Sequence, residues 1–93
     1  MKDKKEKWYV YLVECLDGSL YTGVSNDVFK RMSKHSSGKG SKYIRAKGFS
    51  RLVYHKLCLN KSDACKKEYH IKRLSRDEKI KWFEKSQNSA LVC

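Results

Sequence analysis

The stretch WYVYLVECLDGSLYTGVSNDVFKRMSKH, residues 8–35, decides the fold of the first part of the chain. It begins with Trp8 to Cys15, which is dense in aromatic and β-branched side chains and apolar on both faces. This pattern is typical of a central strand that is covered on both sides. A turn at Asp17-Gly18 follows, and Ser19 to Val24 is the predicted return strand of a hairpin.

The length of this turn decides whether Tyr11 and Tyr21 lie on the same face of the sheet. A two-residue type I′ loop at Asp17-Gly18 would place the two tyrosines on opposite faces. A three-residue loop over residues 16–18, with Gly18 in the left-handed conformation, pairs Cys15 with Ser19 and makes the tyrosines diagonal neighbours. Both loops suit the sequence Asp-Gly. If the tyrosines act together, the three-residue loop is the predicted one.

A helix is predicted from about residue 27 to 36, with Asn26 as its N-cap. Its stripe at i, i+3, i+4 and i+7 consists of Val28, Arg31, Met32 and His35. Arg31 and His35 therefore stack one turn apart at the edge of the buried face. The ordinary alternative is a surface helix with a solvated histidine.

The following segment, SSGKGSKYIRAKG at residues 36–48, is rich in glycine and serine and carries several basic side chains and one tyrosine. A flexible backbone with basic groups and an aromatic ring suits phosphate contacts and base stacking, whereas the alternative is a mobile solvated connection. The residues predicted to bind nucleic acid here and at the end of the preceding helix are Lys34, Lys39, Lys42, Tyr43, Arg45 and Lys47.

The second half of the chain predicts a third strand over Phe49–Leu59, antiparallel to the hairpin, with His55 on the surface. A helix capped by Ser62 is predicted over 63–74, and it places Glu68 on the inward stripe between two apolar residues. A carboxylate there is costly unless it is paired or holds a cation, and Arg31 is the expected structural partner. A short helix over 77–85 closes the core. The predicted organisation is a charged flexible N-terminus at 1–7, one domain at 8–85 and a flexible tail at 86–93.

Composition narrows the class of partner. The chain has 93 residues, 22 Lys plus Arg against 10 Asp plus Glu, and a formal net charge of +12. A basic excess of this size favours a polyanionic partner, because phosphate neutralisation releases condensed counterions. No C-x-x-C pair, secretory segment or membrane-length apolar run is present in the sequence, which predicts a cytoplasmic protein without membrane attachment.

Phosphodiester hydrolysis is the chemistry that these residue types suit. It needs a cation at the phosphorane, a carboxylate for a divalent metal, and groups that move protons at the water and the leaving oxygen. Arg31 can supply the first and Glu68 the second, while a tyrosine or His35 can act in the proton transfers. The sequence has no P-loop, zinc-protease motif or dinucleotide fingerprint that would compete with this interpretation.

The motifs resemble those of the GIY-YIG nuclease family, and especially its short stand-alone bacterial members. The first motif stands here as Tyr9-Val10-Tyr11 and the second as Tyr21-Thr22-Gly23. Arg31, His35 and Glu68 follow at the family's spacing, and the resemblance covers about residues 8–80. This sequence has Tyr9 where the family has the leading glycine and Thr22 in place of isoleucine. The asparagine that many members carry after the glutamate has no counterpart here except Asn88.

The resemblance implies an α/β (α+β) fold, a three-stranded antiparallel sheet flanked by helices, with a one-metal site on its surface. It implies that Tyr11 is a general base or orients water, that Tyr21 positions phosphate or water, and that Arg31 stabilises the transition state. His35 would assist proton transfer, and Glu68 would hold Mg²⁺ or Mn²⁺. The resulting hypothesis is a metal-dependent DNA endonuclease, structure-selective and linked to DNA repair or processing. The alternative is a nucleic-acid-binding module without catalysis.

Overall fold

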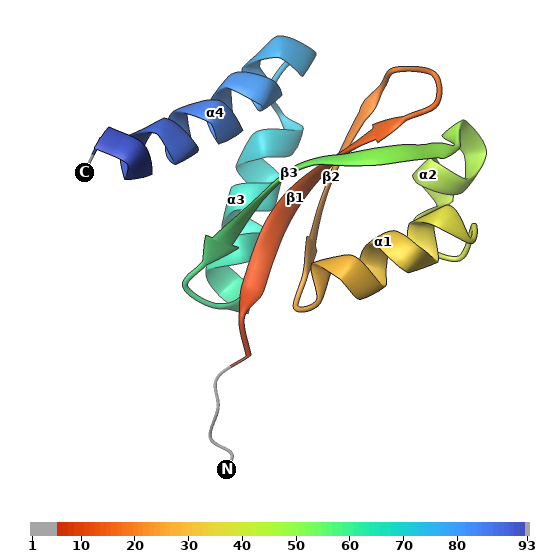
Figure 1. Ribbon diagram of the computed structural model, residues 1–93, viewed down its shortest axis with the longest axis horizontal. Helices are drawn as coiled ribbons and strands as arrows, with labels where there is room; N and C mark the ends of the chain where they lie inside the picture. The colour runs from red at the N-terminus through yellow and green to blue at the C-terminus, as the bar shows by residue number, and fades with distance from the viewer. Residues whose placement is uncertain (1–5, 93) are drawn as a thin grey trace.

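The computed structural model describes residues 6–92, and the side chains of residues 6–86. The elements follow one another as strands and helices in a mixed order (Figure 1): β1 Trp8–Cys15, β2 Leu20–Ser25, α1 Val28–Ser36, α2 Lys42–Lys47, β3 Phe49–Cys58, α3 Lys61–Lys72 and α4 Arg76–Val92. The predicted short strands and amphipathic helices are therefore present, with one further helix, α2.

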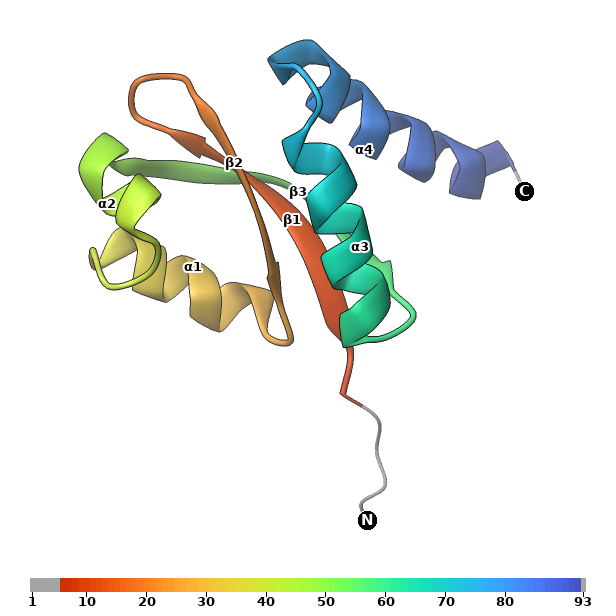
Figure 2. The same cartoon turned by 180° about the vertical axis from the view of Figure 1, so that it is seen from behind.

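The three strands form an antiparallel sheet in the order β2-β1-β3. β1 is the central strand, as its continuous apolar character predicted. Helices α1 and α2 lie on one side of the sheet, and α3 and α4 lie on the other (Figures 1 and 2). The predicted fold class, a small three-stranded antiparallel sheet flanked by helices, is confirmed.

The hairpin turn has the three-residue form. The backbone N–H of Cys15 donates to the carbonyl of Ser19, the N–H of Gly18 donates back to Cys15, and Gly18 has φ 87°. Val13 consequently pairs with Tyr21 and Tyr11 with Gly23. Tyr11 and Tyr21 therefore lie on the same face of the sheet, as the three-residue loop predicted.

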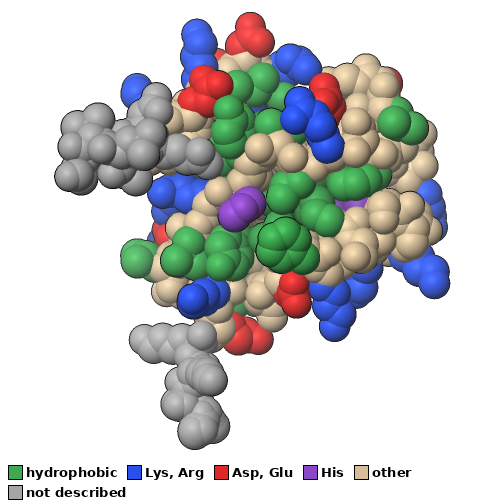
Figure 3. All heavy atoms as spheres, in the orientation of Figure 1, with side chains coloured by type: hydrophobic (Ala, Val, Ile, Leu, Met, Phe, Trp, Pro, Cys, Tyr) green, Lys and Arg blue, Asp and Glu red, His purple; other side chains and the backbone are tan. Residues whose placement is uncertain are grey.

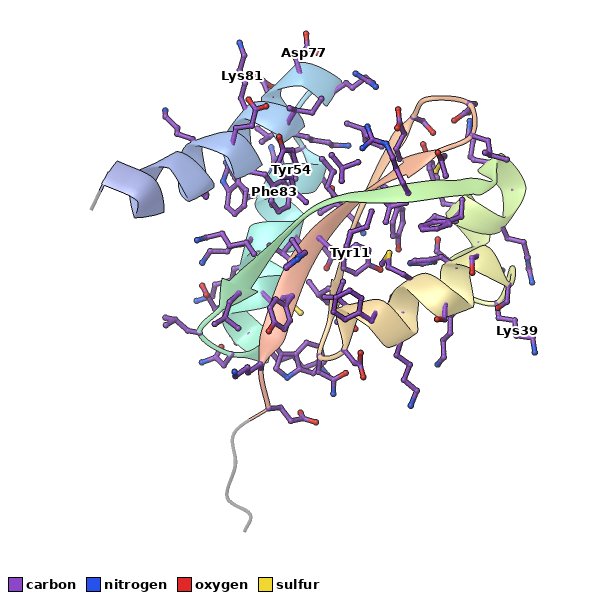
Figure 4. All side chains as sticks on the ribbon, viewed as in Figure 1. Tyr11, Lys39, Tyr54, Asp77, Lys81 and Phe83 are labelled. Atoms are coloured by element: carbon purple, nitrogen blue, oxygen red, sulfur yellow. The ribbon has the colours of Figure 1, made fainter. Side chains whose placement is uncertain are left out.

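The alternation of side chains along β1 divides the core into two layers. Val10 and Leu12 pack on the α3/α4 side in an apolar cluster with Ala64, Ile71 and Phe83. Phe83 stacks on Tyr54 of β3 with ring centroids 5.7 Å apart, and Figure 4 shows the two rings between β3 and α4. The odd-numbered β1 residues Tyr11, Val13 and Cys15 pack on the α1/α2 side in a second cluster with Ile44 of α2.

β3 alternates imperfectly because its register with β1 shifts. Leu12 pairs with Tyr54, but Val13 pairs with Leu52, so Val53 is the extra residue of a bulge. The shift sends Val53 and Tyr54 to the α3/α4 layer and Leu52 to the α1/α2 layer. His55 is exposed on this strand, as predicted.

Several predicted boundaries were wrong by a few residues. The N-cap of α1 is Asp27, whose side chain accepts from the N–H of Lys30, instead of Asn26. The N-cap of α3 is Asn60, which accepts from the N–H of Asp63, instead of Ser62. All four are capping residue types, and the point where the preceding strand leaves the sheet selects among them.

The two segments predicted to be irregular contain helix. Within 36–48, Ser41 caps α2 by accepting from the N–H of Tyr43, and Ile44 anchors α2 in the core. α4 continues to Val92, so residues 86–92 extend the helix that was expected to end near Lys85. Residues 1–5 of the predicted N-terminal segment lie outside the described residues. No helix in the described part of the chain is long and apolar enough to span a membrane.

Candidate active site

A buried tyrosine and a buried histidine form the centre of the site. Tyr11 is 2% exposed and His35 is 3% exposed. The Tyr11 hydroxyl and Nε2 of His35 are 3.0 Å apart, within hydrogen-bond distance. β1 supplies the tyrosine and α1 the histidine, so the bond joins the sheet to the helix. His35 was predicted at the edge of the buried face, with a solvated histidine as the alternative; both are wrong, because the side chain is fully inside the core.

Two glycines leave the space that these rings fill. A Cβ at Gly23 would lie 2.5 Å from the Tyr11 hydroxyl and 2.6 Å from Cζ of that ring. A Cβ at Gly40 would lie 2.3 Å from Nδ1 of His35. The Tyr11 ring therefore lies directly over Gly23 of β2, and the His35 ring lies against the segment that leads into α2.

The second tyrosine lies beside this pair and connects it to α2. Tyr21 meets the His35 ring edge-on at 6.0 Å between centroids. Its other neighbour is Tyr43 of α2, which stacks on it at 5.6 Å with an interplanar angle of 28°. Tyr43 is 41% exposed, and Nζ of Lys47 lies 5.7 Å from the centroid of its ring. A partly exposed ring with a cation beside it can stack on a nucleobase.

Arg31 of α1 and Glu68 of α3 both shift the pKa of the Tyr11 phenol. Burial raises the pKa of the Tyr11 phenol above its usual value, and the neighbouring Tyr21 and the Glu68 carboxylate raise it further. The Arg31 guanidinium opposes this by lowering the pKa of the phenol. Because β2 is an outer strand, groups from α1 and α3 can approach each other around it. The predicted catalytic residues are therefore electrostatic neighbours, and the phenol is protonated at neutral pH.

His35 is held in its neutral form. Burial lowers the pKa of its imidazole, and the positive charge of Arg31 lowers it further. Its Nδ1 is buried and has no hydrogen-bond partner among the described residues. A neutral imidazole has one ring nitrogen that accepts and one that donates, so Nε2 can accept the phenol proton in one tautomer.

Glu68 provides the carboxylate of the site, but its partner is not the expected one. Its Oε2 lies 3.1 Å from Nζ of Lys72, one turn further along α3, and its side chain is 22% exposed. Arg31 makes no ion pair with it. The Arg31–Glu68 pair, expected only as the ordinary alternative to a metal ligand, is therefore wrong, because the i,i+4 spacing within α3 already gives Glu68 a cation.

The candidate site offers a divalent metal few protein ligands. Among the described residues no group of three or more His, Cys, Asp or Glu could enclose an ion. Mg²⁺ commonly binds one or two carboxylates and completes its shell with water and substrate phosphate. Glu68 is half-buried, and its carboxylate already binds the ammonium group of Lys72. Because this carboxylate can bind a cation, it can serve as the single protein ligand of the metal. The side chain of Asn88 lies outside the described residues.

The residues predicted to bind nucleic acid surround the site without forming one continuous cluster. Lys34 lines an open pocket with Arg31 on α1, and Lys39 points away from the body of the protein between α1 and α2 (Figure 4). Lys47 is bound to Asp17 at 3.2 Å and lies over the Tyr43 ring. The predicted set is exposed in full: Lys34, Lys39, Lys42, Tyr43, Arg45 and Lys47. Figure 3 shows apolar side chains across the middle of one face and both basic and acidic side chains around its rim.

Two lysines at the site were missed by the sequence analysis. Lys72 and Lys79 line a pocket with Tyr21 and Tyr43. The spacing Glu68-x-x-x-Lys72 is a recognisable helical ion pair and could have been found from the sequence. Lys79 gave no local signal, because only the packing of α4 brings it to the pocket.

The site and the fold agree with a family match. The model of the GIY-YIG catalytic domain, the domain of a nuclease family, matches residues 7–81. A UPF0213 protein of Staphylococcus saprophyticus is 47% identical over 76 residues, covering 82% of this chain and 93% of that protein. A UPF0213 protein of Oceanobacillus iheyensis is 47% identical over 79 residues, covering 85% of this chain and 92% of that protein.

A solved structure is also similar in sequence. The solution NMR structure of a UPF0213 protein from Bacillus halodurans has 45% sequence identity and a TM-score of 0.47, covering 91% of this chain and 84% of that chain. The chain belongs to the GIY-YIG family, together with these UPF0213 proteins. Nucleases of this family act on nucleic acid and generally use divalent metal ions, so the family agrees with the phosphodiester chemistry that the residues suggest.

Proposed function

We propose that this protein is a metal-dependent endonuclease that hydrolyses phosphodiester bonds in DNA. The observation that carries the proposal is the buried Tyr11–His35 hydrogen bond of 3.0 Å, with Arg31 and Glu68 close enough to change the pKa of the phenol. A buried phenol between a neutral imidazole, a guanidinium and a carboxylate has no evident structural purpose, because an apolar side chain would pack there at lower cost.

Each side chain has a distinct role in the proposed reaction. The Tyr11 oxygen accepts a proton from the attacking water while its own proton passes to Nε2 of His35. The Arg31 guanidinium stabilises the charge that develops on the phosphorane oxygens. Tyr21 orients the phosphate or the water. Glu68 would hold Mg²⁺ or Mn²⁺, which supplies Lewis-acid stabilisation at the phosphate when it is bound.

The charge distribution supports a polyanionic substrate. The net charge is +12, and the basic side chains that surround the site can follow a phosphate backbone. We propose DNA as the substrate, with selection by shape more than by sequence, in cytoplasmic DNA repair or processing.

Cleavage of labelled duplex, nicked and branched DNA tests this proposal. Wild type with Mg²⁺ or Mn²⁺ should cleave, whereas Glu68→Ala, Arg31→Ala and Tyr11→Phe should each lose about 10²- to 10⁴-fold in rate, the scale of a lost proton-transfer or charge-stabilising group. Phe29→Ala, at a side chain that is 78% exposed, is the control and should cleave like wild type. Equal cleavage by wild type and all the variants would point to a contaminating nuclease.

A second function is favoured by one observation. Glu68 is neutralised by Lys72, as a structural ion pair in a nucleic-acid-binding module would be. Such a module would bind DNA with a steep salt dependence and would show no metal-dependent cleavage. The same cleavage assay, with binding measured in parallel at several salt concentrations, separates the two functions.

A further inference from the structure

An open pocket beside the candidate active site brings together two aromatic rings and two lysines. Its lining residues come from the outer strand β2 and from α2, α3 and α4, and Figure 2 shows where these elements lie. Its lining consists of Leu20, Tyr21, Thr22, Tyr43, Lys72 and Lys79. The proposed reaction uses Tyr21 alone among these residues, so the pocket needs an explanation of its own.

Lys79 is a cation without a counterion in this pocket. It is half-buried, and no carboxylate among the described side chains lies within ion-pair distance of its Nζ. Lys72 is its charged neighbour, and both burial and Lys72 lower the pKa of Lys79. Two ammonium groups that line the same pocket repel, and an anion bound there would relieve that repulsion.

Lys72 contacts both the Glu68 carboxylate and the Tyr21 ring from a single position. Its Nζ lies 3.1 Å from Oε2 of Glu68 and 5.7 Å from the centroid of the Tyr21 ring. Its side chain is 49% exposed, and an exposed i,i+4 pair of this kind is weak. A divalent ion bound by Glu68 would compete with the Lys72 ammonium for the same negative charge.

We propose that the pocket binds a phosphate and a base of the nucleic acid next to the cleaved bond, and that Lys72 leaves Glu68 to complete it when a divalent ion binds. This inference rests on the proposed function, since it takes Glu68 as the metal ligand. Lys79 provides a positive charge that does not depend on the metal, and the partly exposed Tyr43 ring takes the base. Lys72 provides a second charge that becomes free only with metal. Metal binding and phosphate binding then strengthen each other, as reciprocal coupling requires.

The first test measures metal affinity without nucleic acid. Mn²⁺ is titrated into the purified full chain, and free Mn²⁺ is followed by electron paramagnetic resonance. Lys72→Met should bind Mn²⁺ about two- to fivefold more tightly than wild type, because a weak competing cation is removed. Lys66→Met removes an equal charge from an exposed position on α3 and should change the affinity much less. Glu68→Gln should abolish the site.

The second test measures DNA affinity with and without a metal that does not support cleavage. A short single strand is titrated by fluorescence anisotropy, in Ca²⁺ and in EDTA. Lys79→Met should weaken binding about three- to tenfold in both conditions, as the loss of one phosphate contact does. Lys72→Met should weaken it by a similar factor in Ca²⁺ and much less in EDTA, where Lys72 is held by Glu68.

The outcomes separate the inference from the proposed function. If Mn²⁺ binds wild type, is lost in Glu68→Gln and binds Lys72→Met no more tightly than Lys66→Met, the metal site stands and the role of Lys72 is refuted. An equal loss of DNA affinity by Lys72→Met in Ca²⁺ and EDTA also refutes it. If no variant binds Mn²⁺, the assignment of Glu68 as metal ligand fails, and the proposed function and the inference fail together.

Discussion

The two faces of the sheet differ in the side chains that the central strand β1 contributes to them. On the α3/α4 face, β1 presents Val10 and Leu12 to a dry apolar cluster that includes Ile71 and Phe83. On the α1/α2 face it presents Tyr11, whose hydroxyl meets an imidazole with an unpartnered Nδ1. A buried nitrogen without a partner reduces stability. We infer that the α3/α4 face stabilises the fold. The α1/α2 face is locally less stable because it holds the polar residues of the candidate active site.

The largest expected effect is the loss of stability caused by a substitution on the apolar α3/α4 face. Phe83→Ala removes a fully buried ring that stacks on Tyr54, and should lower the free energy of unfolding by about 3–5 kcal/mol. Urea denaturation followed by circular dichroism measures it. Phe29→Ala, at an exposed phenylalanine, should change stability by less than about 0.5 kcal/mol. A loss below about 1 kcal/mol for Phe83→Ala would show that α4 contributes little to the core.

A smaller effect is expected for Gly23→Ala on the polar face. The new Cβ would meet the Tyr11 hydroxyl at 2.5 Å, so the ring must move and its bond to His35 must lengthen. We expect a loss of stability of about 1–3 kcal/mol, which is typical of overpacking. We also expect the rate of the proposed cleavage to fall by about tenfold or more, because the Tyr11 hydroxyl would be misplaced.

The matched control for that substitution is Gly18→Ala in the hairpin turn. Gly18 has open space around it but a φ of 87°, so an alanine there costs about 1 kcal/mol of stability through backbone strain alone. It should leave cleavage unchanged at temperatures where the variant is folded. If both glycine variants lose cleavage to the same extent, the Tyr11 position is not what Gly23 preserves.

The smallest expected effect is a pH dependence that arises from His35. Its pKa is lowered in the folded state by burial and by Arg31, so the unfolded chain binds a proton at a higher pH than the folded chain does. The stability that this difference contributes is complete above the unfolded pKa, near 6.5, and is lost as the pH falls toward the folded pKa. Denaturation midpoints between pH 8 and pH 5 should therefore fall with decreasing pH.

Replacement of the histidine isolates its share of that slope. His35→Phe should flatten the dependence over this range, although the variant also loses the bond to Tyr11. His55→Gln, at a solvent-exposed histidine of β3, is the control and should keep the wild-type slope. A slope that persists in His35→Phe would assign the pH dependence to other groups.

The sequence predicted much of the fold because the relevant signals are local. The apolar run of β1, the Asp-Gly turn and the i, i+3, i+4, i+7 stripe of α1 each depend on backbone hydrogen bonds between near neighbours. The register of the hairpin followed from the requirement that Tyr11 and Tyr21 share a face. The errors were local too: Asn26 and Asp27 are both capping residues, and the glycines around residues 36–48 concealed the short helix that Ile44 anchors.

The sequence by itself predicted the residues of the candidate site: Tyr11, Tyr21, Arg31, His35 and Glu68. Only the tertiary structure decided how these side chains lie and which partners they have. Packing of α1 on β1 buried His35 and gave it Tyr11 as a partner, and packing of α4 brought Lys79 to the pocket of Lys72. The bulge at Val53 set which face each residue of β3 serves. These contacts join residues far apart in the chain, and their geometry depends on the packing of whole elements rather than on any local pattern.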